Sequence, residues 1–128
     1  MKNFLEYNTL IQKVKSVLTD DLLSPKWKKI VSKEDNHPTS GHCYAASEAL
    51  YHLLGGKEAG FKPQIGKTDE NTTHWWLIDS DNKILDPTSE QFFYKNQIPP
   101  YNNARGSGFL TKNPSKRAQI IIDRVNEL

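Results

Sequence analysis

Cysteine is almost missing from this chain of 128 residues, because Cys43 is the only one. A single cysteine cannot form an internal disulfide, which excludes the class of small secreted domains held together by disulfides. A reducing compartment is then the default, so we expect a cytoplasmic protein. The lone thiol is either a small apolar residue or a nucleophile, and its surroundings in the sequence must decide between the two.

Long apolar runs and a strong charge of one sign are also missing. No stretch approaches the roughly 20 apolar residues of a membrane-spanning helix, and the N-terminal segment MKNFLEYNTLIQK lacks the apolar centre of a signal peptide. The 17 basic and 15 acidic residues leave a net charge of only +2. We expect a soluble single domain over residues 1–128 with no membrane partner, and the charge does not favour nucleic acid.

Three segments carry the apolar spacing of helices. Apolar residues recur every three or four positions over residues 4–18 and again after Ser115, which is a good helix N-cap. Alanine and leucine cover most sides of a helix over residues 44–54, which predicts a buried helix that ends at Gly55 and Gly56. The buried face of the last helix is predicted to hold Ala118, Ile121, Ile122, Val125 and Leu128.

Strand signals lie between the second and third of these helices. Residues 74–79 (HWWLID) and 83–86 (KILD) have strand composition and are joined by a turn over residues 80–82, which predicts a hairpin. Residues 61–66 can add an edge strand, since their proline argues against a central one. Residues 95–108 are rich in asparagine, proline and glycine and are predicted to form a long loop.

Cys43 lies at the start of the central helix. The unpaired backbone N–H groups and the dipole of a helix N-terminus favour a thiolate over a thiol. His74 begins the first strand of the predicted hairpin, and Asp86 ends the second. A cysteine, a histidine and an aspartate in these positions can act as nucleophile, base and orienting carboxylate.

The hairpin register decides whether the histidine and the aspartate can meet. If Ile78 faces Ile84, then Trp76 faces Asp86, and His74 becomes a diagonal neighbour of Asp86 on the same face. A shift of one residue would move Asp86 to the opposite face. The catalytic interpretation therefore predicts this register.

The segments GHCYAASEALYHLLGG, THWWLID and ILDPTSEQF carry a resemblance to a known family. Over residues 38–94 the chain resembles the small YunG-like bacterial proteins. Its order of cysteine, histidine and aspartate resembles that of papain-like and transglutaminase-like thiol enzymes. The resemblance implies an α+β fold with a papain-like or transglutaminase-like core, in which the cysteine-bearing helix packs on a small antiparallel sheet flanked by the terminal helices. It places the catalytic residues at Cys43, His74 and Asp86.

Further residues are candidates for support of this chemistry. Asn36, in the polar loop upstream, is a candidate oxyanion donor beside the Cys43 backbone N–H, although a turn asparagine is the simpler interpretation. The family's glutamine before the cysteine corresponds to His42, so an oxyanion role at that position is open. Gln91 matches the family's closing motif. Trp76 shares a face with His74 and is a candidate wall of the substrate site, with simple packing as the alternative.

The first functional hypothesis is a thiol hydrolase or acyltransferase that acts on an amide, isopeptide or ester bond. It requires no cofactor or metal, and the chain has no cysteine pair or histidine spacing typical of a zinc site. Its substrate would be a protein, a peptide or a small molecule, anionic or neutral. Because His42 replaces the family's glutamine, an inactive domain that only binds a partner is a further hypothesis.

A different hypothesis rests on the basic C-terminal region, residues 102–128. A helix N-terminus with basic side chains can hold an anion, and here ordinary surface charge is the alternative. The tail GSGFLTKNPSKRAQIII resembles the tails of small phage-encoded proteins. That likeness implies an infected host cell and a nucleotide-type signal as ligand. The predicted anion-binding residues are Arg105, Lys112, Ser115, Lys116 and Arg117.

Overall fold

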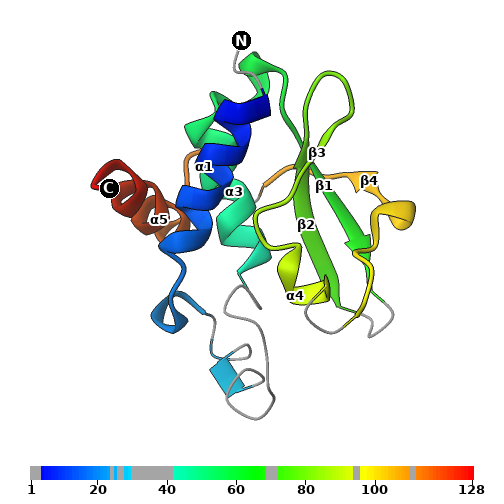
Figure 1. Cartoon of the computed structure of the whole chain (residues 1–128), viewed down its shortest axis with the longest axis horizontal. Coiled ribbons are helices and arrows are strands. Elements are labelled where there is room, and N and C mark those ends of the chain that lie inside the picture. The colour runs from blue at the N-terminus through cyan, green and yellow to red at the C-terminus, as the bar shows by residue number, and fades with distance from the viewer. Residues whose placement is uncertain are drawn as a thin grey trace.

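The fold is α+β, with the three longest described helices on one side of a small antiparallel sheet (Figure 1). The computed structural model describes residues 4–23, 25, 28–29, 42–68, 72–93, 96–109 and 112–128. The helices are α1 (Phe4–Ser16), α3 (Cys43–Leu53), α4 (Glu90–Phe93) and α5 (Lys116–Asn126), with single turns η1 (Asp20–Leu22), η2 (Gly56–Ala59) and η3 (Tyr101–Asn103). The strands are β1 (Lys62–Lys67), β2 (Thr73–Ile78), β3 (Ile84–Leu85) and β4 (Arg105–Gly106).

The central helix α3 connects the two layers of the molecule. It packs against β2 and β1 and also against α1 and α5, which lie on its far side in Figure 1. Its alanines and Leu50 are fully buried, as the sequence predicts for a helix covered on several sides. Gly55 follows with a φ of 104°, a left-handed conformation that glycine adopts without strain. The predicted helix is confirmed, and Cys43 is its first residue.

The four strands of the sheet run in the order β3-β2-β1-β4. Ile78 pairs with Ile84, which is the register that the catalytic interpretation requires. The prediction that residues 61–66 form an edge strand is wrong, because β1 lies between β2 and β4. The proline is tolerated because β4 is only two residues long and the carbonyl of Pro63 accepts a hydrogen bond from the Ser107 N–H at 3.3 Å.

The two faces of the sheet bury different groups. Leu77 and Leu85 belong to the main hydrophobic core, together with apolar side chains of α1, α3 and α5. His74 and Trp76 alternate with Leu77 and contact Phe92 of α4 and Tyr101 of η3. The histidine therefore lies on the face of the sheet that the segment after β3 covers.

The C-terminal helix follows the predicted pattern with one exception. The Ser115 hydroxyl caps α5 by accepting from the Ala118 N–H at 3.3 Å, and Ile121 and Val125 are buried. Leu128 was predicted on the same buried face, but its exposed fraction is 68% because α5 ends at Asn126. The predicted loop over residues 95–108 is also wrong in part, since it contains η3 and β4.

None of the helices in the described part of the chain is long and apolar enough to span a membrane.

Candidate active site

Cys43 occupies the first turn of α3 with its side chain half-buried. Its Sγ lies 3.7 Å from the carbonyl oxygen of Thr73, the residue before His74 in β2. The preceding residue, His42, is the N-cap of α3 and makes no side-chain capping bond. The thiol therefore lies where a helix N-terminus meets the start of a strand, and both the helix dipole and the backbone N–H groups point toward it.

His74 and Asp86 form a buried pair on the neighbouring strands. The Nε2 atom of His74 lies 2.6 Å from Oδ2 of Asp86, and the exposed fractions of the two side chains are 1% and 3%. The register explains this contact. Because Ile78 pairs with Ile84, Trp76 lies opposite Asp86, and His74, two positions away along β2, is the diagonal neighbour of Asp86. Burial shields the pair from water and salt, so its attraction is stronger than that of a surface ion pair.

The Asp86 carboxylate is held by three more hydrogen bonds. Its Oδ2 accepts from the Tyr101 hydroxyl at 2.7 Å, and its Oδ1 accepts from the backbone N–H of Thr88 at 3.0 Å and from the Thr88 hydroxyl at 3.4 Å. These donors stabilise the ionised carboxylate and fix its orientation. Burial raises the pKa of the Tyr101 hydroxyl, and the negative charge of Asp86 and the hydrogen bond to it raise this pKa further.

The charge state of His74 follows from these neighbours. Burial alone would lower the pKa of the imidazole. Hydrogen bonds to Asp86 and to the Cys43 side chain, with the charges of both groups, outweigh burial and raise the pKa to about 9. His74 is therefore an imidazolium at neutral pH.

The two ring nitrogens of His74 have different neighbours. Because Nε2 is bound to Asp86, Nδ1 is the nitrogen that remains for other contacts. The side-chain nitrogen of Gln91 lies 3.5 Å from Nδ1 and donates to the Thr88 carbonyl at 3.0 Å. The sequence placed Gln91 in support of the site, and the structure brings it to the reactive side of the imidazole.

Trp76 is not the substrate wall that the sequence predicted. Its exposed fraction is 1%, and its ring stacks on the imidazole of His74 at a centroid distance of 5.6 Å and an angle of 26°. The strand alternation correctly put Trp76 on the histidine's face, but that face is covered by Tyr101. Trp76 therefore supports the imidazole from behind and does not reach a substrate.

The other tryptophan of the pair lies closer to the surface. Trp75 is half-buried and contacts the ring of Tyr44, the residue after the cysteine, at a centroid distance of 4.8 Å. It also stacks on Phe109, at 5.5 Å and an angle of 19°. The aromatic surface next to Cys43 is thus formed by Trp75 and its neighbours rather than by Trp76.

The predicted anion site at the start of α5 is already filled by a group of this chain. The carboxylate of Glu48, in α3, is fully buried and accepts from the Ser115 N–H at 2.9 Å and from the Ser115 hydroxyl at 2.6 Å. Arg117 donates to the Leu22 carbonyl at 3.2 Å. The prediction of an external anion at Ser115 is wrong, because Glu48 provides the negative charge that this helix N-terminus attracts.

The remaining members of that predicted cluster do not join in one site. Arg105 lies in β4 at the edge of the sheet, and Lys116 is exposed in the first turn of α5. Lys112 lines a groove beside α3 that contains none of the other four residues. Asn36, the predicted oxyanion donor, lies outside the described residues. His42 lies directly before Cys43 and is buried, as a support position requires.

Sequence reasoning missed Tyr101, which binds the same Asp86 oxygen as His74. The residue lies in a segment that reads as a loop, and nothing in its spacing points to Asp86. One signal was available in Gly66, which pairs with His74 across β1 and β2. A Cβ at Gly66 would lie 2.6 Å from the Pro100 carbonyl oxygen, so the glycine is needed to let the chain bring Tyr101 close to the sheet.

Within the described part of the chain, histidine, cysteine, aspartate and glutamate side chains do not gather in any group of three that could hold a metal ion. No family model matches the chain, and neither the curated proteins nor the solved structures contain a significant match. The resemblance to YunG-like proteins and to a papain-like core therefore stays a prediction.

Proposed function

We propose that the protein is a thiol hydrolase or acyltransferase that acts on an amide, isopeptide or ester bond. The observation that carries the proposal is the buried His74–Asp86 pair beside a half-buried cysteine that begins a helix, at 3.7 Å from the carbonyl of the residue before His74. A helix start favours the thiolate, and a buried carboxylate keeps the imidazole charged and oriented.

In the proposed reaction the Cys43 sulfur attacks the carbonyl carbon of the substrate and forms a C–S bond. In the resting pair Nδ1 of the His74 imidazolium already carries the proton, and it gives this proton to the leaving amine or alcohol as the C–N or C–O bond breaks. Water, or an acceptor amine, then attacks the thioester carbonyl and loses a proton to the same Nδ1. The C–S bond breaks, the acid or the acylated amine is released, and the Cys43 thiolate and the His74 imidazolium are restored. Backbone N–H groups at the start of α3 are placed to stabilise the oxyanion.

Alkylation of Cys43 by iodoacetamide tests this proposal without knowledge of the substrate. The rate is measured by intact mass against pH in wild type, in His74→Ala and in His52→Ala, a matched control that removes a histidine from the far end of α3. An ordinary thiol reacts mainly above a pH of about 8.5. We expect the wild type and His52→Ala to react well below that pH, and His74→Ala to lose this reactivity.

Two results would overturn the proposal. Equal alkylation profiles for wild type and His74→Ala would show that the histidine does not activate the thiol. Alkylation only in denaturant would show that Cys43 is a structural residue, and the interaction-domain hypothesis would replace the enzyme. If the expected profile is found, activated esters and thioesters follow as substrates, with a covalent acyl adduct on Cys43 that is absent from Cys43→Ala.

A further inference from the structure

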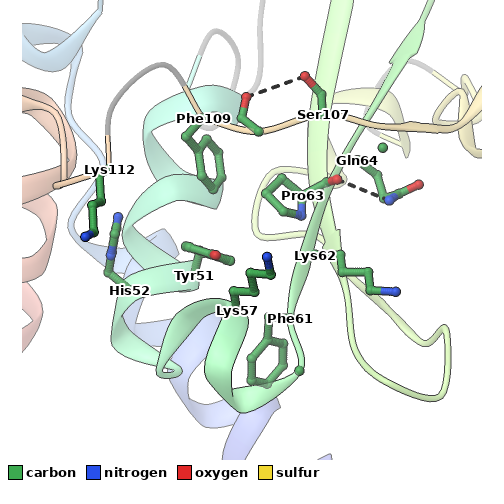
Figure 2. A pocket seen from close by; sticks show the side chains of 13 residues that line it. Tyr51, His52, Lys57, Phe61, Lys62, Pro63, Gln64, Ser107, Phe109 and Lys112 are labelled. Atoms are coloured by element: carbon green, nitrogen blue, oxygen red, sulfur yellow. Dashed lines mark hydrogen bonds between the residues drawn. The ribbon is translucent and has the colours of Figure 1, made fainter.

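A groove lies beside α3, at the end of the helix opposite to Cys43. It has a volume of about 810 Å³, and α3, η2, β1 and the segment 106–109 form its sides (Figure 2). Tyr51 lies eight positions along α3 from Cys43, a rise of about 12 Å, and the groove shares Phe109 with the aromatic surface beside Cys43. Its volume is within the range of about 300 to 1,000 Å³ that is typical of small-molecule sites.

The interior of the groove is mainly aromatic and apolar. Tyr51, Phe61, Pro63 and Phe109 line it, and the rings of Tyr51 and Phe109 contact each other at a centroid distance of 5.3 Å. Figure 2 shows these side chains around one hollow, with Tyr51 on the α3 side and Pro63 on the β1 side. Such a surface suits a flat, apolar body, because burial of aromatic faces is favourable and stacking adds to it.

The charges at the groove are of one sign. Lys57 and Lys112 line it, and neither has an ion-pair partner among the described residues. Figure 2 shows the Lys57 side chain extending between Tyr51 and Phe61 toward Pro63, whereas Lys62 extends away from the aromatic side chains. The described lining contains no aspartate or glutamate. A negatively charged group would therefore be attracted here, with no carboxylate to oppose it.

We propose that the groove binds a small organic anion: a molecule with a flat apolar body that lies on the aromatic residues and an acidic group that the positive charges of Lys57 and Lys112 attract. Two independent features select this chemistry, namely the apolar interior and the unopposed lysines. Cys43 does not line the groove, so the test of this binding site is independent of the test of the proposed reaction.

Binding of the fluorescent anion 8-anilinonaphthalene-1-sulfonate tests the proposal at low ionic strength, with uncharged N-phenyl-1-naphthylamine as the matched neutral probe. We expect saturable binding of the anion at one site, clearly tighter than that of the neutral probe. The variant Lys57→Gln/Lys112→Gln should weaken it about tenfold, as expected for loss of a charged hydrogen bond. Lys13→Gln/Lys83→Gln, which removes the same charge from exposed lysines elsewhere, should change it less than about twofold.

Competition then identifies the acidic group. Displacement of the probe by phenyl phosphate or by benzoate distinguishes a phosphate ligand from a carboxylate ligand, and either result supports the site. Cys43→Ala should bind the probe like wild type. The proposal is overturned if the two double variants lose affinity equally, if the neutral probe binds as tightly as the anion, or if neither competitor displaces the probe. Thermal unfolding of each variant shows whether it is folded.

Discussion

Two of the buried carboxylates in the described part of the chain, Asp86 and Glu48, have partners that give them different consequences. Asp86 binds His74, Tyr101 and Thr88 on one face of the sheet, whereas Glu48 binds the backbone and hydroxyl of Ser115 at the start of α5. Of these partners, His74 has a pKa raised to about 9, and it also interacts with the Cys43 side chain. Burial makes both carboxylates important for stability, but a titratable partner is needed before a buried charge can serve chemistry.

The largest expected effect is a dependence of stability on pH through His74. Its pKa is about 9 in the folded protein against 6.5 as an ordinary value. The imidazolium therefore adds stability that is fully present below the ordinary pKa of 6.5 and is lost as pH rises through about 9. The difference corresponds to roughly 3 kcal/mol. Urea unfolding from about pH 6 to about pH 10 measures it, and subtraction of the same curve for His74→Gln isolates it.

If the difference in free energy of unfolding between wild type and His74→Gln stays constant over this pH range, the raised pKa of His74 is contradicted. Glu48→Gln provides the comparison. Ser115, the partner of Glu48, does not titrate in this range, so the free energy of unfolding of Glu48→Gln plotted against pH should run parallel to that of wild type.

Next in size is the effect of Asp86→Asn on the thiol. An amide keeps the shape of the carboxylate but not its charge, so the pKa of His74 falls and the imidazolium no longer favours a thiolate at Cys43. We expect alkylation of Cys43 near neutral pH to slow about 100-fold, which corresponds to about 3 kcal/mol. Glu48→Gln should leave the alkylation rate within about twofold of wild type, because it lies outside these contacts. Equal slowing in both variants would point to a general loss of structure.

Substitutions at the second carboxylate should change stability instead. Ser115→Ala removes the cap of α5 and one bond to Glu48, so we expect the free energy of unfolding to fall by about 1–3 kcal/mol. Chemical denaturation measures this change. A matched control is Ser107→Ala, which changes a serine whose hydroxyl makes only a long bond of 3.5 Å. A stable Ser115→Ala protein would mean that water replaces the hydroxyl at Glu48.

Tyr101→Phe should have the smallest effect and the most specific one. Without the hydrogen bond from the tyrosine hydroxyl, the negative charge of Asp86 interacts more strongly with His74, so the pKa of His74 rises further. We expect a change of a few-fold in the alkylation rate at most, with a shift of the His74 titration to higher pH by NMR. A shift to lower pH would show that Tyr101 orients Asp86 toward His74 rather than competing for its charge.

The sequence predicted those parts of the site that depend on local pattern. The period of a buried helix placed Cys43 at its start, and the period of two along the hairpin placed His74 and Asp86 on one face. The same period could not show that Trp76 lies beneath other residues, because depth depends on a segment that follows far along the chain.

The contacts that were missed join residues far apart in sequence. No sequence pattern near Glu48 predicts its contact with Ser115, which is 67 positions away. The two residues of β4 are too few to show a strand pattern. The central position of β1 and the occupied helix N-terminus of α5 therefore could not be read from local composition. Tyr101 was missed for the same reason, since its role depends on the close approach that Gly66 permits.

The bond between Glu48 and Ser115 also constrains the order of folding. During synthesis α3 leaves the ribosome long before Ser115 does, so the buried carboxylate of Glu48 lacks this partner until Ser115 has been made. Arg124 and Arg117 of α5 likewise bind carbonyls of Val17 and Leu22, about 100 positions before them. Contacts of such long separation form late and slow the search for the native state. Cys43 is thus carried by a helix whose packing is completed only after α5 has been made.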